Sequence, residues 1–188
     1  MSEENVEIVR MPIAVSSTSR RRVVERLIVR FPRITAFVVR RVQRLSSRSR
    51  LRQNLLRRFF RQGTEAINRG DYRAVFMGFY SADAQLVPAS NVVGLGLEGT
   101  RGREDRIAFQ ERWIAEWGEF LFEPEEIVDL GDGRRVMMIG RIRGTGLSSG
   151  ATFNDQWGVI FTISDGQVVR EEVFFDHAEA LQAAGLSE

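Results

Sequence analysis

Apolar residues in the first third of the chain recur every three to four positions, which is the period of an amphipathic helix. The pattern covers residues 20–45 and resumes at residue 51. Pro32 breaks or kinks the first helix, and the stretch 46–50 is expected to form a linker or an N-cap before the next one. The predicted apolar positions are Val24, Leu27, Ile28, Phe31, Ile34, Phe37, Val38, Val42 and Leu45, followed by Leu51, Leu55, Leu56, Phe59, Phe60 and Ile67.

The middle of the chain mixes helical and extended patterns. The predicted elements are a helix at 72–80, a short strand at 84–88, a glycine-rich loop at 94–102 and a helix at 104–120. Asp71 is the expected N-cap residue of the first of these helices. The second carries Ile107, Phe109, Trp113, Ile114 and Trp117 mostly on its inner side.

The last part of the chain is typical of β-strands, because apolar and polar residues alternate with a period of two. Four long strands are predicted at 122–130, 135–145, 152–164 and 167–175. Gly-Asp-Gly, Ser-Ser-Gly and Asp-Gly sequences supply the turns between them. Helices followed by an antiparallel meander indicate an α+β fold in which a strongly bent sheet wraps around the helices.

Composition narrows the class of protein. The 188 residues are 43% hydrophobic and 28% charged, which suits one folded domain and excludes a disordered or fibrous chain. No apolar run reaches the roughly 18 residues of a membrane-spanning helix. The absence of cysteine excludes disulfides, a thiolate nucleophile and cysteine-ligated metal sites. Because the acidic start lacks the features of a signal peptide, we expect a cytoplasmic location.

The net charge of +2 conceals two oppositely charged parts. Residues 1–70 contain 17 arginines and 5 acidic residues, whereas residues 71–188 contain 10 arginines and 20 acidic residues. We therefore divide the chain into a basic, partly helical arm at 1–50 and a domain at 51–188. The arginines of 20–62 suit an anionic membrane surface, nucleic acid or an acidic protein partner. The alternative is that the apolar stripe of the arm docks on the acidic domain, within the chain or across a dimer.

Five segments, in this order, carry a resemblance to a known family: Asn68-Arg-Gly-Asp71, Gly99-Thr-Arg-Gly-Arg103, Glu123 to Asp132, Ser164 to Arg170 and Asp176 to Leu186. Over roughly residues 60–186 the chain resembles the SnoaL-like group of the NTF2-like superfamily, with the basic arm as an insertion. The resemblance implies a cone-shaped α+β barrel, commonly a homodimer through its sheet, with a mostly apolar pocket at its open end. The superfamily includes isomerases, polyketide cyclases, epoxide hydrolases and members without catalysis, so the fold does not decide the activity.

Three acidic residues of the last strands are the candidate general bases: Asp155, Glu172 and Asp176. Polyketide cyclases of this group use an acid on these strands. Asp155 shares its strand face with Trp157 and other apolar residues, as expected of a pocket wall that holds one acid. Glu172 and Asp176 share a face of the last strand, about 13 Å apart. The alternative is that Asp155 lies in water and that Glu172 pairs with an arginine across the sheet.

The expected ligand contacts are Tyr80, Trp117, Arg141, Trp157 and Phe174. Trp157 and Phe174 would form an apolar wall. Arg141 would meet an anion in the pocket or pair with Glu172. Tyr80 would either enter the pocket or complete the edge of the core.

Other chemistries find less support in the sequence. The positions that ketosteroid isomerases of this fold use for proton transfer fall near Gly63 and Pro88, whose side chains cannot exchange a proton. His177 is the only histidine, so a typical zinc site cannot form, and this residue is expected at the surface or as a helix cap. Because no phosphate-binding glycine motif is present either, we expect no metal and no cofactor.

Two functions remain open at this point. The first is a domain that binds a small hydrophobic molecule in its pocket, with isomerase, cyclase or hydrolase chemistry as an open addition. The second is a non-catalytic interaction module whose arginine-rich arm makes the functional contacts.

Overall fold

The computed structural model describes residues 32–89 and 99–186 of the chain. The elements in this part are α2 (Pro32–Gln43), α3 (Arg50–Asn68), α4 (Tyr72–Phe79), β1 (Tyr80–Pro88), β2 (Thr100–Arg101), α5 (Arg103–Ala115), β3 (Trp117–Asp129), β4 (Arg135–Gly146), β5 (Thr152–Ser164), β6 (Gln167–Phe174) and α6 (His177–Ala184). The strands form a sheet in the order β2-β1-β6-β5-β4-β3. The predicted α+β class and the meander of four long strands are confirmed. One pair, β1 with β6, is parallel.

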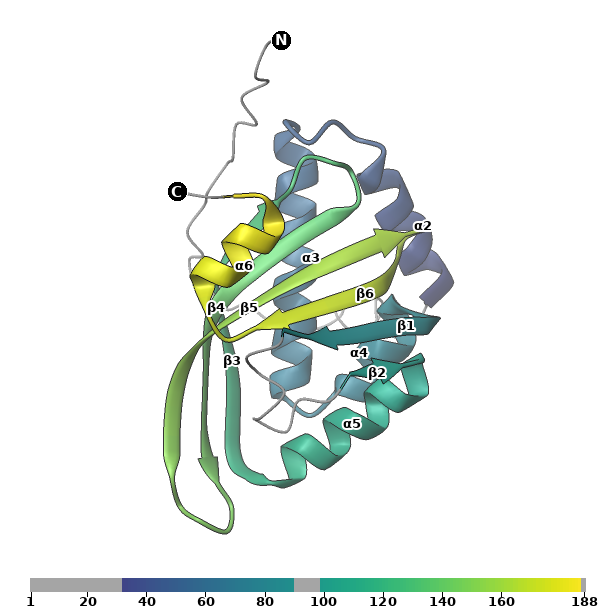
Figure 1. The fold of residues 1–188 in the computed structure, drawn as a ribbon. Coiled ribbons are helices and arrows are strands. Elements are labelled where there is room, and N and C mark those ends of the chain that lie inside the picture. The colour runs from purple at the N-terminus through teal and green to yellow at the C-terminus, as the bar shows by residue number, and fades with distance from the viewer. Residues whose placement is uncertain (1–31, 90–98, 187–188) are drawn as a thin grey trace, which may run out of the picture.

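Helices cover the two faces of this curved sheet unequally (Figure 1). On one face, α3, α4 and α5 enclose the main core together with β1 and β3 to β6. On the other face α6 packs against the middle strands, over a smaller cluster around Met137, Ile160 and Phe174. Within the described part of the chain, no helix combines the length and the apolar character that crossing a membrane requires.

A β-bulge in β3 helps to bend the long strands. The register of β3 against β4 shifts between Pro124 and Glu126, so β3 contains one extra residue there. Pro124 cannot donate to the ladder, and a bulge is one of the places where a strand tolerates proline. Opposite the bulge lies Gly140, where a Cβ atom would overlap the carbonyl oxygen of Glu123. Only glycine permits this approach of the two strands.

Two predicted helix ends are wrong because strand pairing takes over. The helix predicted at 72–80 ends at Phe79, and Tyr80 begins β1. The helix predicted at 104–120 ends at Ala115, and Trp117 already pairs with Gly146 of β4. Aromatic residues continue the helical spacing beyond Ala115, but from Trp117 onward the backbone pairs with β4 instead.

The described part of the basic arm, residues 32–50, is docked on the domain within the same chain. Val39 and Val42 of α2 are buried in the main core. At the end of α2, the Gln43 side chain donates to the carbonyl oxygens of Gly133 and Ile163, at 3.3 and 3.2 Å. The predicted helix of residues 20–31 lies outside the described residues.

The outer face of α2 is not covered by the residues that the structure describes. Phe37 and Val38 are about half exposed, beside the exposed Arg40 and Arg41, although their spacing placed both on the apolar side. Leu51 is exposed as well. Binding of an anionic surface or an acidic partner by the arm therefore stays a prediction, as does the homodimer.

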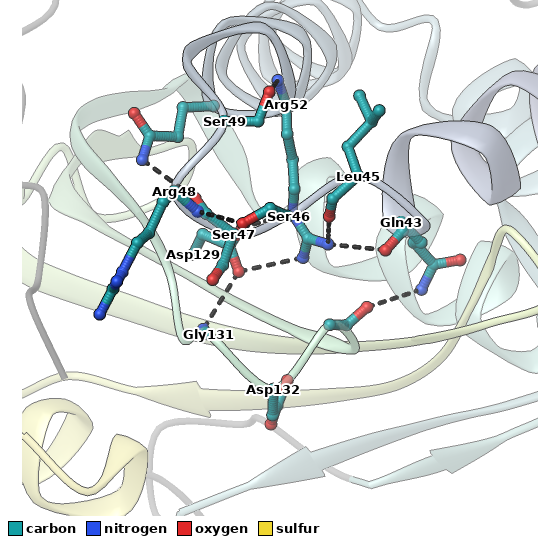
Figure 2. A network of polar contacts seen from close by, with 12 residues as sticks. Gln43, Leu45, Ser46, Ser47, Arg48, Ser49, Arg52, Asp129, Gly131 and Asp132 are labelled. Atoms are coloured by element: carbon teal, nitrogen blue, oxygen red, sulfur yellow. Dashed lines mark hydrogen bonds and ion pairs between the residues drawn. The ribbon is translucent and has the colours of Figure 1, made fainter. Parts of the chain in front are cut away.

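A buried ion pair fastens the turn between α2 and α3 to the sheet (Figure 2). Ser49 caps α3 as predicted, because its side chain accepts a hydrogen bond from the backbone N–H of Arg52. The Arg52 guanidinium lies 2.5 and 3.1 Å from the two carboxylate oxygens of Asp129 on β3. Its Nη1 also donates to the carbonyl oxygens of Gln43 and Leu45, at 2.7 and 3.0 Å. One arginine thus ties together the end of α2, the start of α3 and the end of β3.

Replacing Arg52 with methionine should lower the free energy of unfolding by about 3–5 kcal/mol, because the Asp129 carboxylate stays buried without a counter-charge. The matched control is Arg143→Met, which breaks an exposed pair with Glu123 and should cost less than about 1 kcal/mol. Urea unfolding of both variants measures the difference. Equal losses would contradict a structural role for the buried pair.

Candidate functional site

A cavity of about 70 Å³ lies between the helices and the sheet. It is several times larger than the roughly 10–15 Å³ that one water molecule requires. Its walls come from α3, α4 and α5 on one side and from β1 and β3 to β6 on the other. Aromatic rings dominate these walls: Phe59, Phe60, Phe79, Phe109, Trp113, Phe122, Trp157, Phe161 and Phe175 all line the cavity.

A β-bulge in β6 determines which residues of this strand face the cavity. Val168 pairs with Ile163 of β5, whereas Arg170 pairs with Thr162, so Val169 is the extra residue. The bulge brings Val168 and Glu171 to the same face although they are three positions apart. Glu171 is thereby turned into an otherwise apolar wall.

Three buried side chains from three elements form one polar cluster in this wall. Arg106 of α5 donates from Nε to Glu171 Oε2 at 2.9 Å and from Nη2 to Glu171 Oε1 at 3.2 Å. This two-point geometry matches the planar guanidinium to the carboxylate. The Tyr80 hydroxyl donates to Glu171 Oε2 at 3.1 Å. Each of the three residues is less than a tenth exposed.

Gln110 extends the cluster along α5. It follows Arg106 by four residues and therefore lies on the same side of the helix. The Nη1 of Arg106 donates to Gln110 Oε1 at 2.8 Å. The guanidinium carbon of Arg106 also lies 4.4 Å from the centre of the Phe76 ring, which is within the range of a cation–π contact.

The pKa values of two groups in the cluster, Tyr80 and Arg106, are raised. Burial raises the pKa of the Tyr80 hydroxyl well above its ordinary value, and the negative charge of Glu171 raises it further. Burial lowers the pKa of Arg106, but the charge and the hydrogen bonds of Glu171 outweigh it, so the pKa lies above its ordinary value. Tyr80 is therefore a neutral hydrogen-bond donor at physiological pH, and Arg106 is a cation. The positive charge of Arg106 is compensated by Glu171, so the cluster offers hydrogen bonds rather than a free charge.

Comparison with known families places the chain. The model of the SnoaL-like domain family matches residues 56–171, more than half of the chain. The chain belongs to the SnoaL-like domain family. No curated protein matches it.

Solved structures share the fold of this SnoaL-like domain. An NTF2-like protein from Burkholderia pseudomallei K96243 is 23% identical, with a TM-score of 0.55 over 66% of this chain and 92% of its own. TerC co-crystallised with polyporic acid is 20% identical, with a TM-score of 0.53 over 65% and 92% of the two chains. A protein with a ketosteroid isomerase-like fold from Catenulispora acidiphila DSM 44928, in complex with trimethylamine, is 13% identical, with a TM-score of 0.54 over 68% and 92%. At these identities the likeness concerns the fold alone.

The three acids proposed from the sequence lie outside the cavity of the SnoaL-like domain. Asp155 is exposed, in the part of β5 that extends past the end of β6. Glu172 points away from the cavity and pairs with Arg170 at 3.1 Å. Asp176 is the N-cap of α6, where its side chain accepts from the backbone N–H of Glu179. The alternation expected along β6 holds from Glu171 onward, but the bulge at Val169 breaks it before that point, and the site lies on the opposite face from Glu172.

The five expected ligand contacts divide between the cavity and other places. Tyr80 and Trp157 line the cavity. Phe174 packs under α6 on the other face of the sheet. Trp117 contacts the Phe153 ring, with the ring centres 4.7 Å apart, and Arg141 donates to Asn154, so neither lines the cavity.

Gly63, Pro88 and His177, which were also singled out from the sequence, lie at different places in the fold. Gly63 lines the cavity, whereas Pro88 does not. His177 is the first residue of α6, and its Nε2 lies 2.8 Å from the carbonyl oxygen of Gly140. It is half-buried and takes no part in the polar cluster.

Sequence reasoning missed Glu171, Arg106 and Gln110. For Glu171 a signal existed, because it is the one charged residue on a strand face shared with Val169, Val173 and Phe175. For Arg106 and Gln110 the spacing of four residues was visible, but such polar pairs are common on exposed helix faces. Their burial follows from the packing of α5 against β1.

We expect the contribution of Tyr80 to stability to be lost in alkali. A raised pKa in the folded state means that the neutral hydroxyl stabilises the fold fully below the ordinary tyrosine pKa of about 10 and progressively less above it. In Tyr72→Phe, Tyr80 is the only tyrosine left, so its phenolate absorbance should appear well above that pH and together with unfolding. Ionisation of Tyr80 near its ordinary pKa, with circular dichroism unchanged, would contradict the burial.

The buried pair of the cluster should behave differently when one or both partners are removed. Glu171→Leu leaves the Arg106 charge unpaired and should destabilise the protein by about 3–5 kcal/mol. The double variant Arg106→Leu/Glu171→Leu removes both charges and should be more stable than Glu171→Leu. Urea unfolding of Arg106→Leu, Glu171→Leu and the double variant tests this coupling. Losses that simply add would show that the two side chains act independently.

Proposed function

We propose that this SnoaL-like domain binds a small, mainly apolar molecule in its aromatic cavity and orients it by the polar cluster of Tyr80, Arg106, Gln110 and Glu171. The observation that carries the proposal is the combination of a mostly apolar cavity with a few convergent polar groups at one wall, as is usual for small-molecule sites. The neighbouring structures with polyporic acid and with trimethylamine support small-molecule binding on this fold.

The cluster favours binding and orientation over proton transfer. Glu171 is the carboxylate among the described residues that line the cavity, so we place any acid–base step there rather than at Asp155, Glu172 or Asp176. Both Glu171 oxygens already accept hydrogen bonds from Arg106 and Tyr80. A base needs a free lone pair directed at the substrate. Three of the roughly four acceptor sites of the Glu171 carboxylate are already taken by Arg106 and Tyr80, so in this proposal its main role is to fix the donors around it.

Gly63 offers a way to close the cavity without disturbing the fold. It lies within α3, lines the cavity, and a Cβ added to it meets no atom within 4 Å. A leucine there would extend into open space and would also favour the helix by nearly 1 kcal/mol relative to glycine.

We expect Gly63→Leu to lower the affinity for tetralin, an apolar probe, at least about tenfold, because the leucine side chain occupies the space of the ligand. Titration calorimetry and quenching of tryptophan fluorescence measure the affinity, and thermal unfolding shows whether the variant is folded. Asn54→Leu, at an exposed position of the same helix, is the matched control and should bind as the wild type does. Unchanged binding by a folded Gly63→Leu would place the ligand elsewhere, and no binding of tetralin by the wild type would remove the support for the proposal.

A further inference from the structure

One donor of the polar cluster has no partner. The side-chain nitrogen Nε2 of Gln110 is buried and makes no hydrogen bond with the described residues. Gln110 is only 1% exposed, so bulk water does not reach it. Buried polar groups are almost always paired, and an unpaired one costs about 1–3 kcal/mol. Among the described residues that line the cavity, Gln110 is the only one with such an atom.

The identity of this atom is fixed by its neighbour. A guanidinium carries only donors, so the group that Arg106 Nη1 approaches at 2.8 Å must be the amide oxygen of Gln110. The other end of the amide is therefore NH₂, with two hydrogens to donate. The Arg106–Gln110 contact thus leaves an N–H donor without a partner on a residue that lines the cavity, and the natural partner of such a donor is an acceptor.

The charges of the cluster limit the kind of acceptor. Glu171 already neutralises Arg106 through two contacts. A carboxylate or phosphate entering the cavity would add a negative charge beside Glu171 with no cation left to balance it, in surroundings where unpaired charge is costly. A neutral oxygen such as that of a ketone, quinone or amide accepts the hydrogen bond without this cost.

We propose that the cavity selects a neutral ligand with a carbonyl oxygen, which accepts a hydrogen bond from Gln110 Nε2 while its apolar body lies among the aromatic rings. This inference rests on the proposed function and specifies its ligand class. Gln110 acts as the group that determines specificity, Arg106 positions it, and Glu171 keeps Arg106 neutralised.

The test compares α-tetralone with tetralin, which share a carbon skeleton and differ in one carbonyl group. The wild type should bind α-tetralone about three- to tenfold more tightly than tetralin, the range expected of one neutral hydrogen bond. In Gln110→Met the ratio of the two affinities should fall to about one. The carbonyl stretching band of bound α-tetralone should lie at lower frequency in the wild type than in Gln110→Met.

A second variant separates loss of the donor from displacement of Arg106. Gln110→Glu, measured at alkaline pH below 10, keeps an oxygen for Arg106 but has no N–H, and it should lose the preference as well. Thermal unfolding of both variants shows that they are folded. Retention of the preference in either folded variant overturns the role of Gln110.

The outcomes also distinguish this inference from the proposed function. Equal affinity of the wild type for α-tetralone and tetralin would overturn the carbonyl preference and leave the cavity as a binding site. Failure of the wild type to bind either probe would count against both. Tighter binding of the carboxylate analogue tetralin-carboxylic acid would overturn the neutrality of the ligand.

Discussion

The bend of the long strands is the constraint on which the site depends. The sheet curves around α3, α4 and α5, and its bulge at Pro124 requires Gly140 on the neighbouring strand. Straight helices inside a bent sheet meet it only through large side chains, and this explains why aromatic rings dominate the space between the layers. Gly63 of α3 has no side chain to extend into that space, so a cavity remains where close packing would otherwise be expected.

A cavity of this kind acquires specificity from the few polar groups that its walls can hold. Burying a charge is unfavourable unless it is paired and hydrogen-bonded, and the walls satisfy this rule with Arg106 and Glu171 from opposite layers. The bulge at Val169 turns Glu171 inward, while the helical spacing of Arg106 and Gln110 brings the amide alongside. The bulge on one strand and the orientation of one helix are therefore sufficient to create the polar wall.

The sequence determined the fold more clearly than the site. Alternation predicted β4, β5 and β6 closely but placed the start of β3 at residue 122 instead of Trp117. The stretch 46–50, expected as a linker or an N-cap, contains Ser49, the N-cap residue of α3, and this signal is also local. The end of α5 depends on pairing between Trp117 and Gly146, which are distant in the chain, and periodicity does not contain that information. Glu171 was grouped correctly with Val173 and Phe175 but wrongly with Val169, because a local pattern does not show the bulge. Which face of the strand lines the cavity is decided only by the packing of the whole sheet.

Two buried arginine–carboxylate pairs in this molecule use the same chemistry but differ in whether the groups around them are satisfied. Arg52 directs its donors to Asp129 and to two carbonyl oxygens at the end of α2, so its surroundings need no further group. Arg106 instead donates one hydrogen bond to the amide oxygen of Gln110. The amide nitrogen of Gln110 has no hydrogen-bond partner among the described residues. A pair whose neighbours are satisfied by the chain itself holds elements together. A pair whose neighbour still lacks an acceptor leaves one donor that the proposed ligand would satisfy, and this difference, rather than burial or charge, separates the two pairs.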